Sequence, residues 1–312
     1  PKKARELRSS SQPHLADVCT MCGRYCSLKL MEECLRPSYR GITGASQAPE
    51  PGSSPGGRFF CFLEGSFLNL KDKVVLITGG ARMGLAVGCA LASRGCRVAV
   101  TYRRSRQSAE DACRAVRGLG REAIAFQVDL AGAKGARNAV SRVEEEWGRL
   151  DVLVPMASVY EKKAFGDLDA KYWEKNLNTN LKSAYDLALS AAPLMKRKGG
   201  GRIVHVADWT AASGRPRYKH YLPYYVSKAG LLGLTEVLAL ELAPEILVNA
   251  IAPGPIMPPR RATKQERDEV EKSTPLRRWG HPEEIAKTVV FLAETDFVTG
   301  ECIRVDGGRH LY

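Results

Sequence analysis

A tyrosine and a lysine four residues apart, Tyr224 and Lys228, form the pair in this sequence best suited to proton transfer. They open a long segment with helical spacing, so we expect both side chains on one face of a helix. An ammonium group beside a phenol favours the phenolate, and we therefore expect Lys228 to lower the pKa of Tyr224 towards neutrality. Such a phenol could donate a proton to a carbonyl or imine while hydride reaches the carbon.

Asp208 stands sixteen residues before Tyr224, just after the apolar run 202–206. Parallel sheets place their chemistry at the carboxyl ends of strands, so we expect Asp208 close to Tyr224. An ionised carboxylate only accepts hydrogen bonds. Asp208 could then accept from a ring N–H or an amino group, or act as an acid if its pKa is raised. Asn180, in the preceding helix, is a further candidate, although it could also be a surface or capping residue.

A glycine-rich turn follows the apolar run 74–78 and precedes helical spacing at 84–93. Glycines let the backbone turn sharply and approach a pyrophosphate at the N-terminus of the following helix. An ordinary turn between a strand and a helix is the alternative interpretation. The residues expected to bind the cofactor in this turn are Thr78, Gly79, Gly80, Arg82 and Gly84.

The next strand, 97–102, ends in a basic turn that contains Arg103, Arg104 and Ser105. A dinucleotide without a 2′-phosphate usually meets an acidic residue here, and this turn has none. Guanidinium and hydroxyl groups suit a phosphate dianion. The turn therefore predicts NADPH in preference to NADH, the alternative being a solvated basic surface turn.

Short apolar strands alternate with helices of ten or more residues from residue 74 onward. This alternation predicts the α/β class, with a Rossmann-type doubly wound parallel sheet in a single domain. The expected strands are 74–78, 97–102, 123–128, 150–154, 202–206 and 248–251, and the clearest helices are 84–93, 108–119 and 133–147.

Composition divides the chain into three parts. Residues 1–40 contain cysteines, residues 41–66 are rich in Gly, Pro and Ser and are typical of a linker, and residues 67–312 form the predicted domain. We expect the N-terminal extension to be poorly structured.

Charge and cysteine content exclude several classes of protein. The net charge is +13, but the basic residues are dispersed and few aromatic residues lie among them, so we expect no nucleic-acid partner. No run of 18 apolar residues exists, so we expect no membrane-spanning helix. The nine unevenly spread cysteines indicate a reducing compartment, and we expect a cytoplasmic protein that acts on a small molecule.

Residues 67–312 resemble the short-chain dehydrogenase/reductase family over essentially the whole domain. The resemblance implies that Asn180, Tyr224 and Lys228 are catalytic and that the protein forms a homodimer or homotetramer. The resemblance also extends to the stretch that closes the chain, Val305-Asp306-Gly307-Gly308. It further implies a set of cofactor contacts, which comprises Asp129, Leu130, Ala157, Pro253, Gly254 and Ile256.

Asp208 departs from the family pattern, in which serine is usual at this position. In this respect the chain resembles the pteridine reductase and dihydromonapterin reductase branch. That resemblance implies that Tyr160 stacks on a pterin, and that Trp209 and Ser158 also line the substrate site. Two further departures, a shortened glycine turn and Pro155-Met156 before Ala157, bear on cofactor affinity.

The N-terminal segment 1–35 resembles the C-terminal cluster loop of phosphomethylpyrimidine synthase. Cys19, Cys22 and Cys26 would suit an iron–sulfur cluster, and together with Cys34 they could hold zinc. The match is short and its second spacing differs, so we expect a remnant or fusion junction and no metal site.

These observations predict an NADPH-dependent reductase that transfers hydride to a C=N or C=O group, with a dihydropteridine as a candidate substrate. A 3-oxoacyl or other carbonyl reductase is the first alternative. A non-catalytic dinucleotide-binding protein is the second.

Overall fold

The structure is a computed structural model that describes residues 68–79, 83–259 and 262–311. These residues belong to the second of the two units into which the chain divides, Gly65–Tyr312. The predicted Cys-containing segment, the linker and the cofactor residues Gly80 and Arg82 lie outside the described residues.

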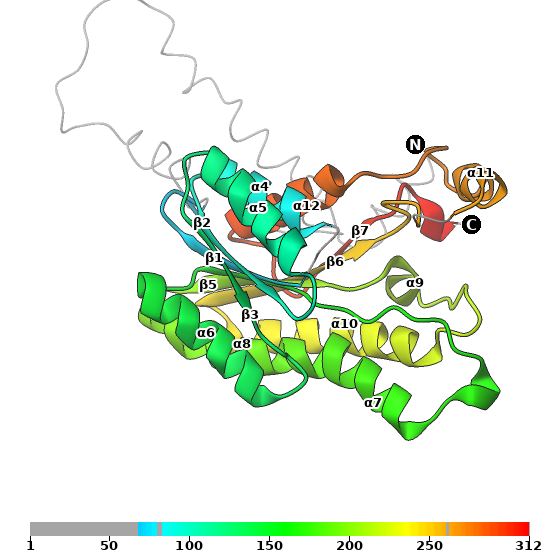
Figure 1. Cartoon of the computed structure of the whole chain (residues 1–312), viewed down its shortest axis with the longest axis horizontal. Helices are drawn as coiled ribbons and strands as arrows, with labels where there is room; N and C mark the ends of the chain where they lie inside the picture. The colour runs from blue at the N-terminus through cyan, green and yellow to red at the C-terminus, as the bar shows by residue number, and fades with distance from the viewer. Residues whose placement is uncertain (1–67, 80–82, 260–261, 312) are drawn as a thin grey trace, which may run out of the picture. The chain divides into compact units, whose positions relative to one another are not determined.

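A parallel sheet of seven strands forms the centre of the described domain, in the order β3-β2-β1-β4-β5-β6-β7 (Figure 1). The strand order reverses direction between β1 and β4, and a crevice for a ligand is expected at that point. The strands are β1 (Val74–Gly79), β2 (Arg97–Tyr102), β3 (Ala123–Gln127), β4 (Val152–Met156), β5 (Gly201–Val206), β6 (Ile246–Pro253) and β7 (Cys302–Val305).

Helices cover both faces of this sheet. On one face lie α4 (Gly84–Ser93), α5 (Arg106–Gly118) and α12 (Pro282–Glu294), and on the other α6 (Ala133–Trp147), α8 (Ser183–Arg197) and α10 (Leu222–Leu242) (Figure 1). The remaining helical elements are η3 (Phe165–Asp167), α7 (Ala170–Leu177), the π-helical turn η4 (Asn178–Lys182), α9 (Trp209–Ala212), α11 (Lys264–Lys272) and η5 (Arg309–Leu311). The predicted Rossmann-type fold is confirmed.

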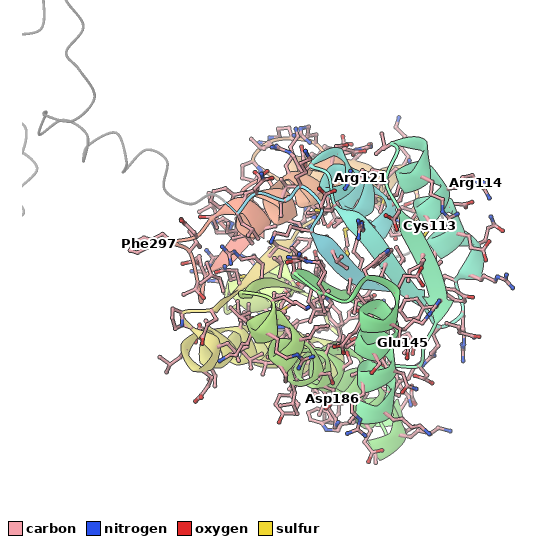
Figure 2. All side chains as sticks on the ribbon, turned by 90° about the vertical axis from the view of Figure 1, so that its left-hand side faces the viewer. Cys113, Arg114, Arg121, Glu145, Asp186 and Phe297 are labelled. Carbon is pink, nitrogen blue, oxygen red and sulfur yellow. The ribbon has the colours of Figure 1, made fainter. Side chains whose placement is uncertain are left out.

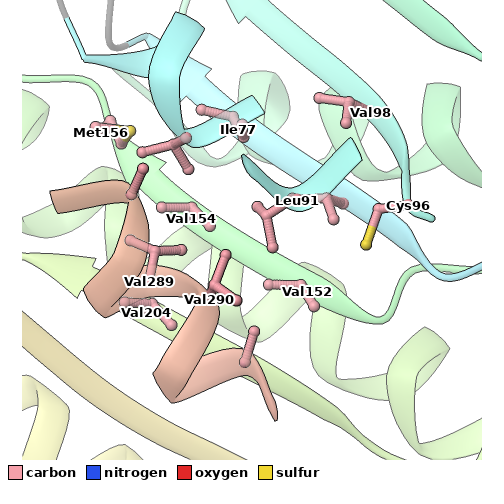
Figure 3. Packing of buried hydrophobic residues seen from close by; sticks show 14 of the residues in the cluster. Ile77, Leu91, Cys96, Val98, Val152, Val154, Met156, Val204, Val289 and Val290 are labelled. Carbon is pink, nitrogen blue, oxygen red and sulfur yellow. The ribbon is translucent and has the colours of Figure 1, made fainter. Parts of the chain in front are cut away.

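Alternate residues of the inner strands supply two separate cores. In β1, Val75 and Ile77 pack in the core beneath α4 and α12, whereas Val74 and Leu76 pack in the core on the opposite face. Figure 3 shows Ile77 and Leu91 within the first of these cores. Burial on both faces explains why the strands are continuous apolar runs without an alternating pattern.

Pro155 lies in the central strand β4, where proline is unusual because it lacks an N–H group. The ladder between β1 and β4 continues to Gly79↔Met156, whereas the ladder between β4 and β5 ends at Leu153↔Ile203. The two strands therefore separate towards their carboxyl ends, where the candidate site lies.

The cysteines of the described part are unpaired and mainly structural. Cys113 is fully buried between α5 and the sheet, and burial raises the pKa of its thiol to about 11 (Figure 2). A thiol with so high a pKa is a poor nucleophile at neutral pH. By contrast, Arg114 and Phe297 extend outward from the domain in the same view.

Within the described residues, no helix is both long enough and apolar enough to cross a membrane.

Candidate active site

A pocket of about 490 Å³ lies at the carboxyl ends of β1, β2 and β4. It brings together many of the residues that sequence predicted for the cofactor and substrate. These are Gly79, Gly84, Arg103, Arg104, Ser105, Asp129, Leu130, Ala157, Ser158 and Tyr160. Segments far apart in the chain thus line one cavity at the point where the strand order reverses.

Gly79 gives this pocket a bare backbone surface, and Thr78, the residue before it, is buried. Gly79 has a φ of +68°, and a Cβ there would lie 2.7 Å from the Cα of Ala157. The Oγ1 atom of Thr78 is buried and has no hydrogen-bond partner among the described residues. A buried hydroxyl without a partner is destabilising, and a polar ligand group at the turn would satisfy it. These features fit a dinucleotide whose pyrophosphate approaches the backbone closely.

The far end of the pocket is basic. Ser105 precedes α5 without capping it through its side chain, and the first turn of that helix contains no acidic residue. Arg104 is exposed, and Arg103 approaches Asp129 only to 4.0 Å. A helix N-terminus flanked by open guanidinium groups suits a phosphate group.

Asp208 and Tyr224 meet beyond the pocket, at the end of β5. The Tyr224 hydroxyl donates to Oδ2 of Asp208 at 2.9 Å. Oδ1 of Asp208 accepts from the backbone N–H and the hydroxyl of Thr210, at 2.8 and 2.5 Å. Asp208 is the N-cap of α9, so its backbone position and its carboxylate are both fixed.

Lys228 lies on the same face of α10 as Tyr224. Its Nζ donates to the carbonyl oxygen of Val206 at 2.6 Å. The Nζ atom is 5.9 Å from the centre of the Tyr224 ring. Lys228 is only 4% exposed, and burial lowers its pKa to about 8. Lys228 is therefore still mostly charged at neutral pH and becomes neutral as the pH rises through about 8.

The pKa of Tyr224 moves in the direction opposite to the one expected from the sequence. Burial and the neighbouring Asp208 carboxylate raise it well above the usual value. The expectation that Lys228 lowers this pKa is wrong, because the phenol donates to a carboxylate and is removed from solvent. Tyr224 therefore stays protonated over the whole neutral range.

Asn180 connects the loop after β4 to α10. Its Oδ1 accepts from the N–H of Val159 at 2.7 Å, and its Nδ2 donates to Val159 O and Ser227 Oγ, each at 3.0 Å. The π-helical turn η4 between α7 and α8 places the amide there, and such turns are common at functional sites. Among the described residues, no direct hydrogen bond joins Asn180 to Lys228.

His205, one strand position before Val206, is neutral. Its Nδ1 is 2.9 Å from Oγ1 of Thr235, and that hydroxyl itself donates to Leu231 O. Burial, together with Lys228, lowers the pKa of His205 to about 3. His205 is therefore no proton donor at neutral pH.

Aromatic rings connect the pocket to the Tyr224 cluster. Tyr160 stacks on Tyr221 with ring centres 4.5 Å apart and meets the Tyr224 ring edge-on at 4.7 Å. Trp209 is 5% exposed and meets Tyr218 edge-on at 6.2 Å. Sequence reasoning missed Tyr218 and Tyr221, although the density of tyrosines between residues 218 and 225 could have indicated them.

Four predicted cofactor residues within the described part of the chain do not line the pocket, namely Thr78, Pro253, Gly254 and Ile256. Pro253 ends β6 and Gly254 follows it, and a Cβ on Gly254 would lie 2.5 Å from the Cα of Asp306. Ile256 is buried in the core beneath α12. Their role towards a cofactor stays a prediction.

Comparison with known proteins defines the class. The sequence pattern of the family described as enoyl-(acyl carrier protein) reductase matches residues 80–310. The chain belongs to the short-chain dehydrogenase/reductase family of oxidoreductases.

Individual relatives have diverse activities. A 3-oxoacyl-[acyl-carrier-protein] reductase of Staphylococcus epidermidis is 32% identical over 246 residues, which cover 77% of this chain and 100% of that protein. An L-rhamnose 1-dehydrogenase of a Sphingomonas species is 34% identical, over 78% of this chain and 98% of that protein. Sequence similarity to these proteins therefore leaves the substrate open.

Solved structures show the same fold. The FolM alternative dihydrofolate reductase 1 of Brucella canis, complexed with NADP, has a TM-score of 0.71 and 33% identity, covering 78% of this chain and 96% of that one. A blue fluorescent protein from a metagenomic library, in complex with NADPH, has a TM-score of 0.70 and 30% identity. The match covers 77% of this chain and 99% of that one.

Proposed function

We propose that this oxidoreductase uses NADPH to reduce a C=N or C=O group in a ring that also carries an N–H or amino donor, such as a dihydropteridine. The observation that carries the proposal is the hydrogen bond of 2.9 Å from the Tyr224 hydroxyl to Asp208. A hydrogen-bond donor on the substrate can take the place of the phenol at the carboxylate. The phenol is then released to donate to the reacting atom.

A simple oxo-thioester carries no donor beside its ketone and would leave Oδ2 of Asp208 without a partner. Leaving a partly buried charged acceptor unpaired costs more than the hydrogen bond itself contributes. The Asp208 carboxylate therefore favours a substrate with a nitrogen donor next to the reducible bond.

The residues of the pocket would hold the cofactor by its charged groups. Arg103, Arg104 and Ser105 would bind a 2′-phosphate, and Thr78 and Gly79 would face the pyrophosphate. The presence of NADP or NADPH in two related structures supports this choice. When bound, NADPH supplies the hydride.

The remaining steps belong to side chains at the end of β5. Tyr224 would deliver the proton to the reacting nitrogen or oxygen as that atom becomes negative. Lys228, held by Val206, would contact the ribose and stabilise the phenolate that the transfer leaves behind. Asn180 would keep the loop that carries Tyr160 attached to α10. Ser158, Tyr160 and Trp209 would contact the substrate.

The test is NADPH oxidation with dihydrobiopterin, dihydromonapterin and an acetoacetyl thioester. We expect turnover of a pterin, and we expect Asp208→Asn to slow it about a hundredfold without weakening NADPH binding. Asp208→Ser should also slow pterin reduction, but it should raise activity on the thioester because a serine hydroxyl can donate to a ketone. Near wild-type pterin reduction in both variants would overturn the role of the carboxylate.

A 3-oxoacyl or other carbonyl reductase is the second candidate, supported by the curated relative of 32% identity. Activity on the thioester alone would establish it. NADPH binding without turnover of any substrate would instead favour a non-catalytic dinucleotide-binding protein. We also propose a homodimer or homotetramer in the cytoplasm, to be tested by light scattering and cell fractionation.

A further inference from the structure

Two arginines contact the indole ring of Trp209, next to the candidate site. The guanidinium carbon of Arg309 lies 5.4 Å from the ring centre, and that of Arg217 lies 5.9 Å from it. Arg217 is in the exposed loop after α9, and Arg309 opens the C-terminal turn η5. Trp209, Arg217 and Arg309 are called the Trp209 subsite below.

Neither arginine of the Trp209 subsite has a carboxylate partner among the described residues. Nη1 of Arg309 donates only to neutral oxygens, namely Val270 O at 3.0 Å, Ser273 Oγ at 2.7 Å and Thr274 Oγ1 at 3.3 Å. Other arginines of the domain are neutralised, as Arg106 is by Glu110 and Arg278 by Glu284. The side chain of Arg309 also forms a hydrogen bond with Tyr218, so only part of its guanidinium group is available. Arg217 has no hydrogen bond or ion pair to the described residues, and its contact with the indole ring leaves its guanidinium edge free to bind an anion.

The Trp209 subsite continues the row of aromatic rings that begins at Tyr224. Tyr218 meets both Trp209, at 6.2 Å, and Tyr221, at 6.5 Å, and Tyr221 stacks on Tyr160. Trp209 also directly follows Asp208 in the chain. A substrate whose reducible ring lies at Tyr224 could therefore follow the aromatic rings and end at the two arginines.

We propose that the substrate carries an anionic group away from its reducible ring, and that Arg217 and Arg309 bind it beside Trp209. The group is a carboxylate or a phosphate, because a guanidinium edge pairs with two oxygens of either. This inference rests on the proposed reductase function for its role, but the anion site can be tested without turnover.

The first experiment measures binding by calorimetry with two unreactive probes. p-Aminobenzoylglutamate represents a carboxylate tail, and pantetheine 4′-phosphate represents a phosphate tail. The probe that binds the wild-type protein identifies the class of anion, and Arg217→Gln should weaken its binding about tenfold. Arg215→Gln is the matched control, since Arg215 is an exposed arginine of the same loop without a ring contact to Trp209. Failure of both probes to bind, or equal effects of the two substitutions, would overturn the proposal.

The second experiment compares kinetics on dihydrofolate, which has a carboxylate tail, with those on neutral dihydrobiopterin. Arg217→Gln should raise the KM for dihydrofolate about tenfold, leave its kcat unchanged and leave dihydrobiopterin unaffected. Arg309→Lys keeps the charge and should have a smaller effect than Arg309→Gln, whose melting temperature is measured in parallel. Equal losses on both substrates would refute an anion site. If neither substrate is turned over while a probe still binds through Arg217, the reductase proposal fails and the anion site stands.

Discussion

The two sides of the crevice hold their charges in different ways. On the side of β2, the side chain of Arg103 is 40% exposed, and Arg104 is exposed as well. On the side of β5, Lys228 is 4% exposed, and Asp208 and Tyr224 are hydrogen-bonded to each other. Binding a phosphate needs only cations within reach, whereas proton transfer needs groups that are desolvated and already oriented. We therefore expect substitutions on the β5 side to affect the chemical step and those on the β2 side to affect affinity.

The largest effect should come from Tyr224→Phe, which removes the proposed proton donor and leaves the ring in place. We expect kcat for NADPH-dependent reduction to fall about a thousandfold. Because Tyr224 does not line the pocket, the dissociation constant for NADPH should be unchanged. Stopped-flow kinetics and fluorescence titration measure the two quantities.

A Tyr224→Phe variant that retained more than a tenth of the wild-type kcat would show that another group supplies the proton. A parallel loss of NADPH affinity would show that the two sides of the crevice are not separable.

Substitution of Lys228 should have the next largest effect on kcat, and this effect should depend on pH. Its pKa is lowered to about 8, so the ammonium is charged below that pH and neutral above it. The pKa of Tyr224 is raised, so this phenol keeps its proton through the same interval. We expect kcat to fall as pH rises through about 8. Lys228→Met should lower kcat about a hundredfold at pH 7 and abolish this decrease.

A pH–rate profile from pH 6 to 10 tests this assignment. A decrease that persists unchanged in Lys228→Met would assign it to another group. Enzyme stability at each pH must be checked by dilution back to pH 7.

The sequence allowed the prediction of those features that depend on local pattern. Apolar runs located six of the seven strands but missed the short β7. Spacing placed Tyr224 and Lys228 on one helix face, because both signals follow from the repeat of a single element. The sequence pattern was insufficient where two elements distant in the chain come into contact. The pKa of Tyr224 depends on its contact with Asp208, and spacing alone emphasised Lys228 instead.

Other features needed the three-dimensional arrangement as well. The stacking of Tyr160 on Tyr221 joins two loops whose conformations no periodicity encodes. Proline argues against a central strand, yet Pro155 is part of β4. This proline is tolerated in the strand because the pairing of β4 with β5 ends before residue 155.

Substitutions on the β2 side should have a smaller effect, and they should change cofactor affinity and not kcat. We expect the double substitution Arg103→Gln and Arg104→Gln to reduce the preference for NADPH over NADH about tenfold or more, since charged hydrogen bonds to the 2′-phosphate are lost. The kcat at saturating NADPH should be unchanged. Arg106→Gln is the control, because Arg106 opens the same helix but is paired with Glu110. Loss of kcat in the double variant would contradict the separation of affinity from chemistry.

The smallest effect should come from substitution of Thr210. This residue does not line the pocket and makes no hydrogen bond to Tyr224, but it donates two hydrogen bonds to the Asp208 carboxylate. Thr210→Val keeps the shape and the backbone N–H bond to Asp208 while removing the hydroxyl bond of 2.5 Å. One such bond contributes about 1 kcal/mol, so kcat should fall about threefold to tenfold, with NADPH affinity unchanged. Thr210→Ser restores the donor and should restore the rate, which a purely structural role would not predict. If serine fails to rescue a stable Thr210→Val variant, the hydroxyl does not orient Asp208, and the backbone N–H alone is enough to hold the carboxylate towards Tyr224.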